Sequence, residues 1–239
     1  MRKVLCYSFL FSFVSVLVAC GGGGSDSASN QSNNATATDS EVVAYLKSSN
    51  IDFSSSNRLP GTWRWPSTPT QHVYVYVPTP TVGNSTQQEY ATKVQNAIGQ
   101  INSKLTGLVI VEALSAVPSS GQYIQVSYDT SYVPPNSTDF SSYCANVSTS
   151  PNVGNVIQPS TTNGIATSPV FINLGNGRCN VTQDIVTHEF AHALGLASHF
   201  NGFGNGPAIS AALWDVLATL YSNPQATVAS NIIVKRAAN

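Results

Sequence analysis

Charged side chains are scarce in this sequence. Only 9% of its 239 residues are charged, whereas 42% are hydrophobic. The few Lys and Arg residues are scattered, and nucleic-acid binding needs clustered positive charge to displace counterions from phosphates. The composition therefore excludes nucleic acid as an expected partner and is typical of a globular protein with a sizeable core.

Long hydrophobic runs are also lacking, except near the start. Arg2 and Lys3 precede an apolar stretch over residues 4–18, which is the pattern of a secretory signal peptide. The stretch is short for a membrane-spanning helix and contains several serines, so an uncleaved anchor is the less favoured alternative. It leads into Leu-Val-Ala-Cys at residues 17–20, which resembles the lipobox of bacterial lipoproteins, in which the cysteine is acylated.

We therefore predict a signal peptide at residues 1–19, lipidation of Cys20 and a flexible linker over 20–40. The linker is rich in Gly, Ser, Asn and Thr and lacks the apolar bulk that folding needs. A plain secreted protein is the alternative. The expected location is the bacterial cell envelope, with the lipid as membrane contact. The residue after the lipidated cysteine is Gly21, whereas an aspartate at that position is associated with retention in the inner membrane. Gly21 therefore favours the outer membrane or the cell surface.

Cysteine is rare as well, with four in the whole chain. Cys6 leaves with the signal peptide and Cys20 carries the lipid, so Cys144 and Cys179 remain as one pair in an oxidising compartment. We expect a disulfide between them. Two free thiols are the alternative, because sequence spacing does not reveal whether the two Cα atoms come within bridging distance.

Hydrophobic periodicity predicts one α+β domain over residues 63–239, with a small mixed sheet and a long amphipathic helix. The helix is expected at 87–104, and strands are expected at 73–78, 108–114, 123–128 and 169–174. Residues 133–167, rich in Ser, Pro and Asn, are predicted to form a long loop. A lead-in segment at 41–62 is expected to form a short helix and is either a remaining propeptide or an irregular extension.

A second helix is predicted over residues 181–194, and a last one over 209–221. Asn180 and Gln183 have the spacing of a capping box, and Gly195 suits the left-handed conformation that ends helices. The chemistry of the chain is concentrated on this second helix.

His188, Glu189 and His192 form the motif His-Glu-x-x-His within that helix. Histidines four residues apart lie on one helix face, so both imidazoles can reach one metal ion. Zinc lowers the pKa of a bound water to about 7, and the adjacent Glu189 can take its proton as general base. The alternative is a pair of structural histidines on an amphipathic helix.

Glutamate is absent from the chain after Glu189. That absence excludes the thermolysin-like site, in which a later glutamate completes the zinc coordination. A catalytic zinc needs three protein ligands and an open position for water. His199 and Asp215 are the downstream candidates, and we favour His199 because imidazole is a common zinc ligand and the glycine turn brings it near with a short loop.

The stretch from His188 to His199 resembles the metzincins, a clan of zincin metallopeptidases, and among them the bacterial matrixin-like peptidases. Arg64-Trp-Pro66 and residues 220–221 add looser support. The resemblance implies a zincin-like domain, a zinc endopeptidase activity on protein or peptide substrates, and an edge strand that binds substrate in extended form. Residues 169–174 would be that strand.

Two features differ from the metzincin pattern. The family's third histidine follows the glycine by three residues, where this chain has Ser198, so His199 requires a different turn. Metzincins also have a methionine beneath the zinc, whereas the only methionine here is Met1. Another residue must therefore lie beneath the metal.

The remaining candidates have simpler interpretations. His72 is expected at the surface, and Tyr221 in the core rather than at an oxyanion. Three tryptophans are expected to anchor the packing, namely Trp63, Trp65 and Trp214. The rival function is a lipid-anchored binding or adhesion module with a structural or relic zinc site, which the intact Glu189 argues against because a purely structural site needs no base.

Overall fold

The computed structural model describes residues 36–53, 59–66, 72–105, 110–119 and 121–239. The predicted signal peptide, Cys20 and residues 21–35 of the predicted linker lie outside the described residues. Within the described part of the chain, no helix has the length and apolar character needed to cross a bilayer.

The structure is mixed α/β and confirms the α+β class at that level. The main helices are α1 (Asp39–Leu46), α2 (Ser85–Lys104), α3 (Gln183–Ala193) and α4 (Ala211–Ser222), and α1 continues into a π-helical turn at Lys47–Ile51. The strands are β1 (His72–Tyr76), β2 (Ile110–Leu114), β3 (Ile124–Tyr128), β4 (Ala145–Ser148), β5 (Val170–Leu174), β6 (Phe200–Asn201) and β7 (Gly204–Asn205).

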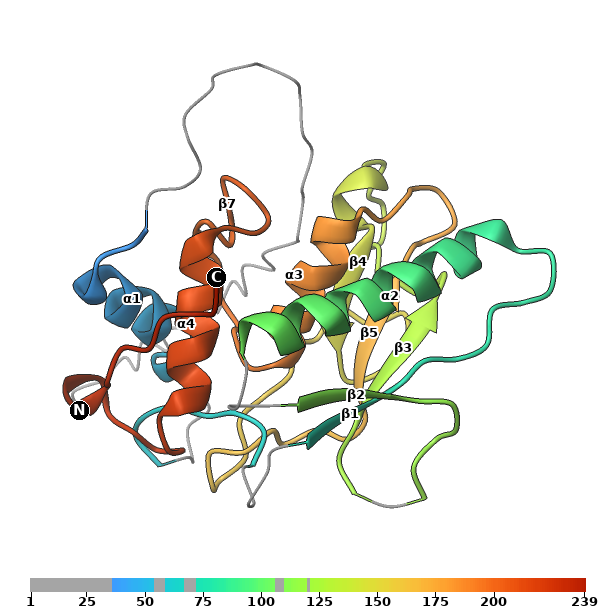
Figure 1. Ribbon diagram of the computed structural model, residues 1–239. Helices are drawn as coiled ribbons and strands as arrows, with labels where there is room; N and C mark the ends of the chain where they lie inside the picture. The colour runs from blue at the N-terminus through green and yellow to red at the C-terminus, as the bar shows by residue number, and fades with distance from the viewer. Residues whose placement is uncertain (1–35, 54–58, 67–71, 106–109, 120) are drawn as a thin grey trace, which may run out of the picture.

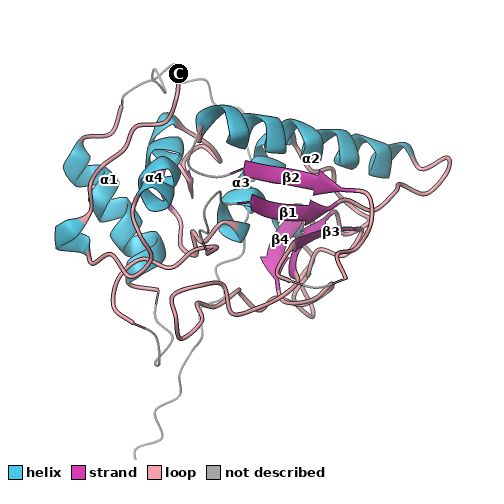
Figure 2. Cartoon of the chain, turned by 60° about the horizontal axis from the view of Figure 1, so that its bottom comes forward, coloured by secondary structure: helices cyan, strands magenta, loops and turns pink. Residues whose placement is uncertain are grey.

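The main sheet has the strand order β2-β1-β3-β5-β4, and β4 alone runs antiparallel to its neighbour. Along β1, Val73 and Val75 are buried while His72 and Tyr74 are exposed, so one face of the sheet is covered and the other faces solvent. Helices α2 and α3 contact each other and cover the buried face (Figure 2).

The prediction that residues 169–174 form the edge strand is wrong. Strand β5 lies between β3 and β4, and the edge on that side of the sheet is β4 at Ala145–Ser148. This strand lies inside the segment predicted to be a long loop. Of its four residues, Ala-Asn-Val-Ser, only Val147 favours strands, so local pattern did not reveal it.

The expected disulfide is confirmed. Cys144, immediately before β4, is bonded to Cys179, which lies before α3, and their Cα atoms are 5.8 Å apart. The bond therefore ties the edge strand to the segment that leads into the helix with the His-Glu-x-x-His motif.

Helix α1 lies beside α4, on the side of the molecule away from the sheet (Figures 1 and 2). Thr38 caps it with a capping box to Glu41, and its first residue is Asp39, so the last two residues of the predicted linker are helical. Val42 and Leu46 are fully buried in the common core. The lead-in segment is thus packed against the rest of the domain.

Candidate metal centre

Helix α3 holds the two motif histidines on a rigid support. It begins at Gln183, and Thr182 caps it by accepting a hydrogen bond from the Ile185 amide at 3.2 Å. The prediction of Asn180 as the cap is therefore wrong. The Gln183 side chain instead donates to the carbonyl of Lys93 on α2, at 3.0 Å, so packing between α2 and α3 accompanies the later start. Val186 and Phe190 bury the opposite face.

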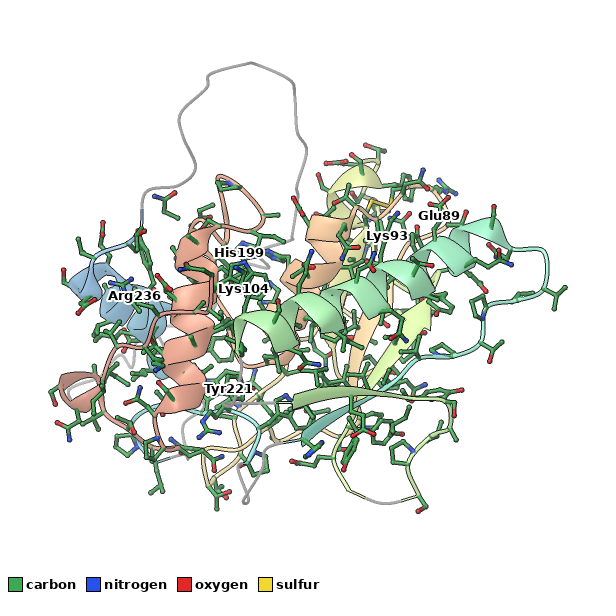
Figure 3. The ribbon with its side chains drawn as sticks, viewed as in Figure 1. Glu89, Lys93, Lys104, His199, Tyr221 and Arg236 are labelled. Carbon is green, nitrogen blue, oxygen red and sulfur yellow. A yellow bond between two sulfur atoms is a disulfide. The ribbon has the colours of Figure 1, made fainter. Side chains whose placement is uncertain are left out.

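The structure brings His188, His192 and His199 together. The Nε2 atom of His199 lies 3.1 Å from Nε2 of His188 and 3.2 Å from Nε2 of His192. Figure 3 labels His199 in the region between α3 and α4. The three side chains form a group that can hold one metal ion.

The outer nitrogens of the two helix histidines meet backbone carbonyls. Nδ1 of His188 is 3.0 Å from the carbonyl oxygen of Ala208, and Nδ1 of His192 contacts that of Leu196. A carbonyl can only accept, so each Nδ1 carries the proton and each Nε2 presents a lone pair. This is the support that metal-ligating histidines usually receive.

Burial keeps these histidines neutral. It lowers the pKa of His188 to about 4, with a smaller lowering from the nearby His199. Burial, followed by the charges of the other two histidines, lowers the pKa of His192 well below its usual value, and burial lowers that of His199. Neutral imidazole is the form that binds metals, so all three are ready as ligands at neutral pH.

Asp215, the alternative third ligand, is engaged elsewhere. Its Oδ2 accepts a hydrogen bond from Arg236 at 2.8 Å, and its Oδ1 accepts one from the Ala237 amide at 3.0 Å. The described metal-binding group contains His199 and not Asp215.

A turn after α3 returns the chain to His199. Gly195 has a φ of 112°, a conformation in which other residues are strained, and a Cβ there would lie 3.1 Å from the carbonyl oxygen of Trp63. The amide of Leu196 donates to the carbonyl of Ala191 at 3.1 Å and closes the helix end. This geometry accommodates Ser198 as an additional residue before the histidine.

Sequence reasoning missed Phe203. Its ring is fully buried, and its centroid lies 4.3, 4.8 and 5.4 Å from those of His188, His192 and His199. It packs against all three imidazoles. The residue lies in a glycine-rich loop, Asn201–Pro207, in which no periodic pattern marks a buried position.

A cavity of about 850 Å³ adjoins the three-histidine group. Glu189, His192 and His199 line it, together with residues 145–147 of the edge strand β4. Glu189 is only 1% exposed and is the sole carboxylate among the described lining residues, of which none is Lys or Arg. The site therefore combines a histidine group that can hold a metal ion, one acid and an edge strand around a common space.

The other singled-out residues have structural positions. His72 lies 3.3 Å from the carboxylate of Glu112 on the neighbouring strand, away from the metal-binding group. Tyr221 is buried, its hydroxyl donates to the Leu194 carbonyl at 2.8 Å, and burial raises its pKa. Trp63 and Trp65 are buried in the core, and Trp214 packs against it.

In comparisons with known proteins, neither the family models nor the curated proteins give a match to this chain.

Proposed function

We propose that this protein is a zinc-dependent endopeptidase of the metzincin type. The observation that carries the proposal is the shared cavity, where Glu189 lies beside two of the three clustered histidines and next to the edge strand β4. A metal site alone would not suggest hydrolysis, but a buried carboxylate beside a metal site and a strand edge does.

The donor set fits zinc. Tetrahedral zinc with Zn–N distances near 2.0–2.1 Å separates its ligand nitrogens by about 3.3 Å. The two Nε2 separations at His199 are 3.1 and 3.2 Å. Within the described residues the group offers three ligands, all neutral imidazoles. Structural zinc sites use four protein ligands, whereas three ligands with an open position are typical of catalytic ones.

Each residue has a defined task in this proposal. When bound here, zinc would lower the pKa of a coordinated water to about 7 and polarise the substrate carbonyl. Glu189 takes the proton of the attacking water and passes it to the nitrogen of the leaving amine. Phe203 and the loop carbonyls of Ala208 and Leu196 hold the imidazoles in orientation. Burial of the Glu189 carboxylate excludes bulk water from this proton path.

The substrate is an extended peptide. Strand β4 has a neighbour on only one side in the sheet order, so its other side can pair with a peptide backbone by β-augmentation. The described cavity lining is mostly apolar or neutral, with aromatic residues such as Tyr132 and Phe53. An apolar side chain of the substrate suits this space better than an acidic one, which would meet Glu189.

The predicted envelope location belongs to the same proposal. A lipid on Cys20 would anchor the domain at the membrane and leave peptides outside the cytoplasm as substrates. Metabolic labelling with a palmitate analogue tests this, because the parent should incorporate label and Cys20→Ser should not. Equal labelling of the two proteins would contradict the anchor.

The test of the enzymatic activity compares the parent with Glu189→Gln. We expect one zinc per chain in both proteins by elemental analysis, since Glu189 is not a ligand. Hydrolysis of a quenched fluorescent peptide library should fall about 10²- to 10⁴-fold in the variant, the usual contribution of a general base. Matching thermal unfolding curves are the control for folding.

Two outcomes would contradict the activity. If the Glu189→Gln variant still hydrolysed peptides at the parent's rate, Glu189 would be excluded as the general base. A zinc-loaded parent that cleaves no library peptide, yet binds a protein ligand equally well after Glu189→Ala, would favour the binding-module alternative.

A further inference from the structure

The segment at residues 45–50 reaches the loop that holds His199. It belongs to the end of α1 and the π-helical turn, about 150 residues earlier in the chain than the histidine. It contacts the loop at four residues, which lie on both sides of His199: Gly195, Ala197, Ser198 and Phe200.

Asn50 makes the first contact. Its side chain is completely buried, and Nδ2 donates to the carbonyl oxygens of Gly195 at 2.8 Å and of Trp63 at 2.7 Å. Its Oδ1 accepts from the Trp63 amide at 3.0 Å. All three hydrogen bonds are made in the interior, where losing a partner leaves a buried polar group unsatisfied. Asn50 thus fixes the start of the turn after α3.

Ser49 and Tyr45 make the remaining contacts. The Ser49 carbonyl accepts hydrogen bonds from the amides of Ala197 at 2.7 Å and Ser198 at 3.4 Å. The ring of Tyr45 stacks on that of Phe200, with centroids 4.7 Å apart and planes inclined by 13°. The residues immediately before and after His199 are therefore both held by this segment.

We propose that residues 45–50 position His199 as the third metal ligand, with Asn50 and Tyr45 as its positioning residues. The proposal rests on the proposed zinc site. His188 and His192 are placed by the local geometry of α3, which fixes their spacing. His199 lies in the loop after α3, so the regular geometry of that helix does not fix its position. Holding this ligand in place before zinc binds reduces the ordering that binding must impose.

This role implies that the segment is not a propeptide that is removed on maturation. Val42 and Leu46 are buried in the core, and Asn50 bonds to the ligand loop, so removal of the segment would expose the core and release the loop. The segment is expected to remain in the zinc-binding form of the protein.

The experiment measures zinc affinity by competition with a fluorescent chelator, and the visible absorption spectrum of the Co²⁺-loaded protein. The variants are Asn50→Ala, Tyr45→Ala and the conservative Tyr45→Phe, which keeps the stacked ring. Val42→Ala is the matched control, since Val42 is a buried α1 residue whose side chain makes none of the loop contacts described above. Thermal unfolding of the metal-free proteins measures the stability lost in each.

Residues that orient metal ligands typically contribute about 10- to 100-fold in metal affinity, so we expect Asn50→Ala and Tyr45→Ala to weaken zinc binding in that range. Their Co²⁺ absorption bands should also shift or weaken. Tyr45→Phe should retain the parent's affinity and spectrum, and Val42→Ala should lose stability while keeping both. If Asn50→Ala does not fold, the two Tyr45 variants decide the result.

If Tyr45→Ala has the same zinc affinity and Co²⁺ spectrum as Val42→Ala, the inference is overturned. The proposed zinc site would then remain intact. A parent that binds no zinc would overturn both the proposed function and this inference.

Discussion

Arg236 donates a hydrogen bond to the carboxylate of Asp215 at 2.8 Å, and this pair joins the C-terminal segment to α4. Arg236 also bonds to Asp39 and to the carbonyl of Ala37, so the same cation links the start of α1 to the C-terminal segment. The one acid downstream of the motif therefore pairs with the cation that links α1, α4 and the C-terminal segment.

Because Asp215 bonds to Arg236, substitutions of His199 and Asp215 should affect different properties. His199→Ala should weaken zinc binding by at least about 100-fold, because it removes a ligand and even outer partners contribute that much. Asp215→Asn should keep the parent's zinc affinity and lower the free energy of unfolding by about 1–3 kcal/mol through the weakened bond to Arg236. Chelator competition and urea unfolding measure the two quantities. Zinc loss in Asp215→Asn would contradict the assignment of His199.

Gly204 should be required for the position of His199. A Cβ on Gly204 would lie 2.7 Å from Cγ and Cδ2 of the imidazole, too close for any real contact. Gly204→Ala is therefore expected to displace the ring and reduce zinc affinity about 10- to 100-fold, as the loss of an orienting partner does.

Gly83→Ala is the matched control for that substitution. Gly83 has a φ of 82° against 75° for Gly204, so both variants strain the backbone, but a Cβ on Gly83 meets no atom within 4 Å. Both proteins should lose stability, and only Gly204→Ala should lose zinc affinity. Equal zinc affinities in the two variants would show that the ring tolerates the methyl group.

The disulfide should contribute substantially to stability. Cys144 and Cys179 are separated by 35 residues, and closing a loop of that length in the unfolded chain corresponds to about 4 kcal/mol in the chain-entropy model. The double substitution to serine should lower the free energy of unfolding by up to that amount in urea titrations. Adding a reductant should destabilise the parent and leave the double variant unchanged; equal stability of the two proteins before reduction would argue against the contribution.

Acid should destabilise the metal-free protein. The pKa of His188 is lowered from 6.5 to about 4 by burial, so between these values the unfolded chain binds a proton that the folded chain does not. The stabilising effect of the neutral histidine is complete above about pH 6.5 and is lost as the pH falls towards 4. His192 and His199 shift in the same direction.

Urea unfolding in the presence of a chelator, at several pH values from 7 to 5, measures this effect. The free energy of unfolding should fall across that range. The His188→Gln variant should show a shallower fall, because one of the groups that takes up a proton on unfolding is gone. An unchanged pH dependence in that variant would exclude His188 as a contributor.

Local pattern predicted much of the fold. Helix α2 and strands β1, β3 and β5 begin and end within two residues of the predicted bounds, because amphipathic spacing and β-branched runs are local properties. The predicted cap of α3, Asn180, was wrong. Asn180 and Thr182 are both good capping residues, and packing against α2 selected between the two possible starts of the helix. The edge strand β4 was missed because Ala-Asn-Val-Ser has little intrinsic preference for a strand.

The sequence by itself determined the pair His188 and His192, because a helix repeats every 3.6 residues and places residues four apart on one face. It also determined Glu189 as the acid beside them. Only the tertiary structure decided that His199 and not Asp215 joins them, that Phe203 packs against the three imidazoles, and that Asn50 holds the turn at Gly195. Asn50 and Gly195 are 145 residues apart. Contacts over such separations depend on how whole elements pack, and no local spacing in the chain encodes them.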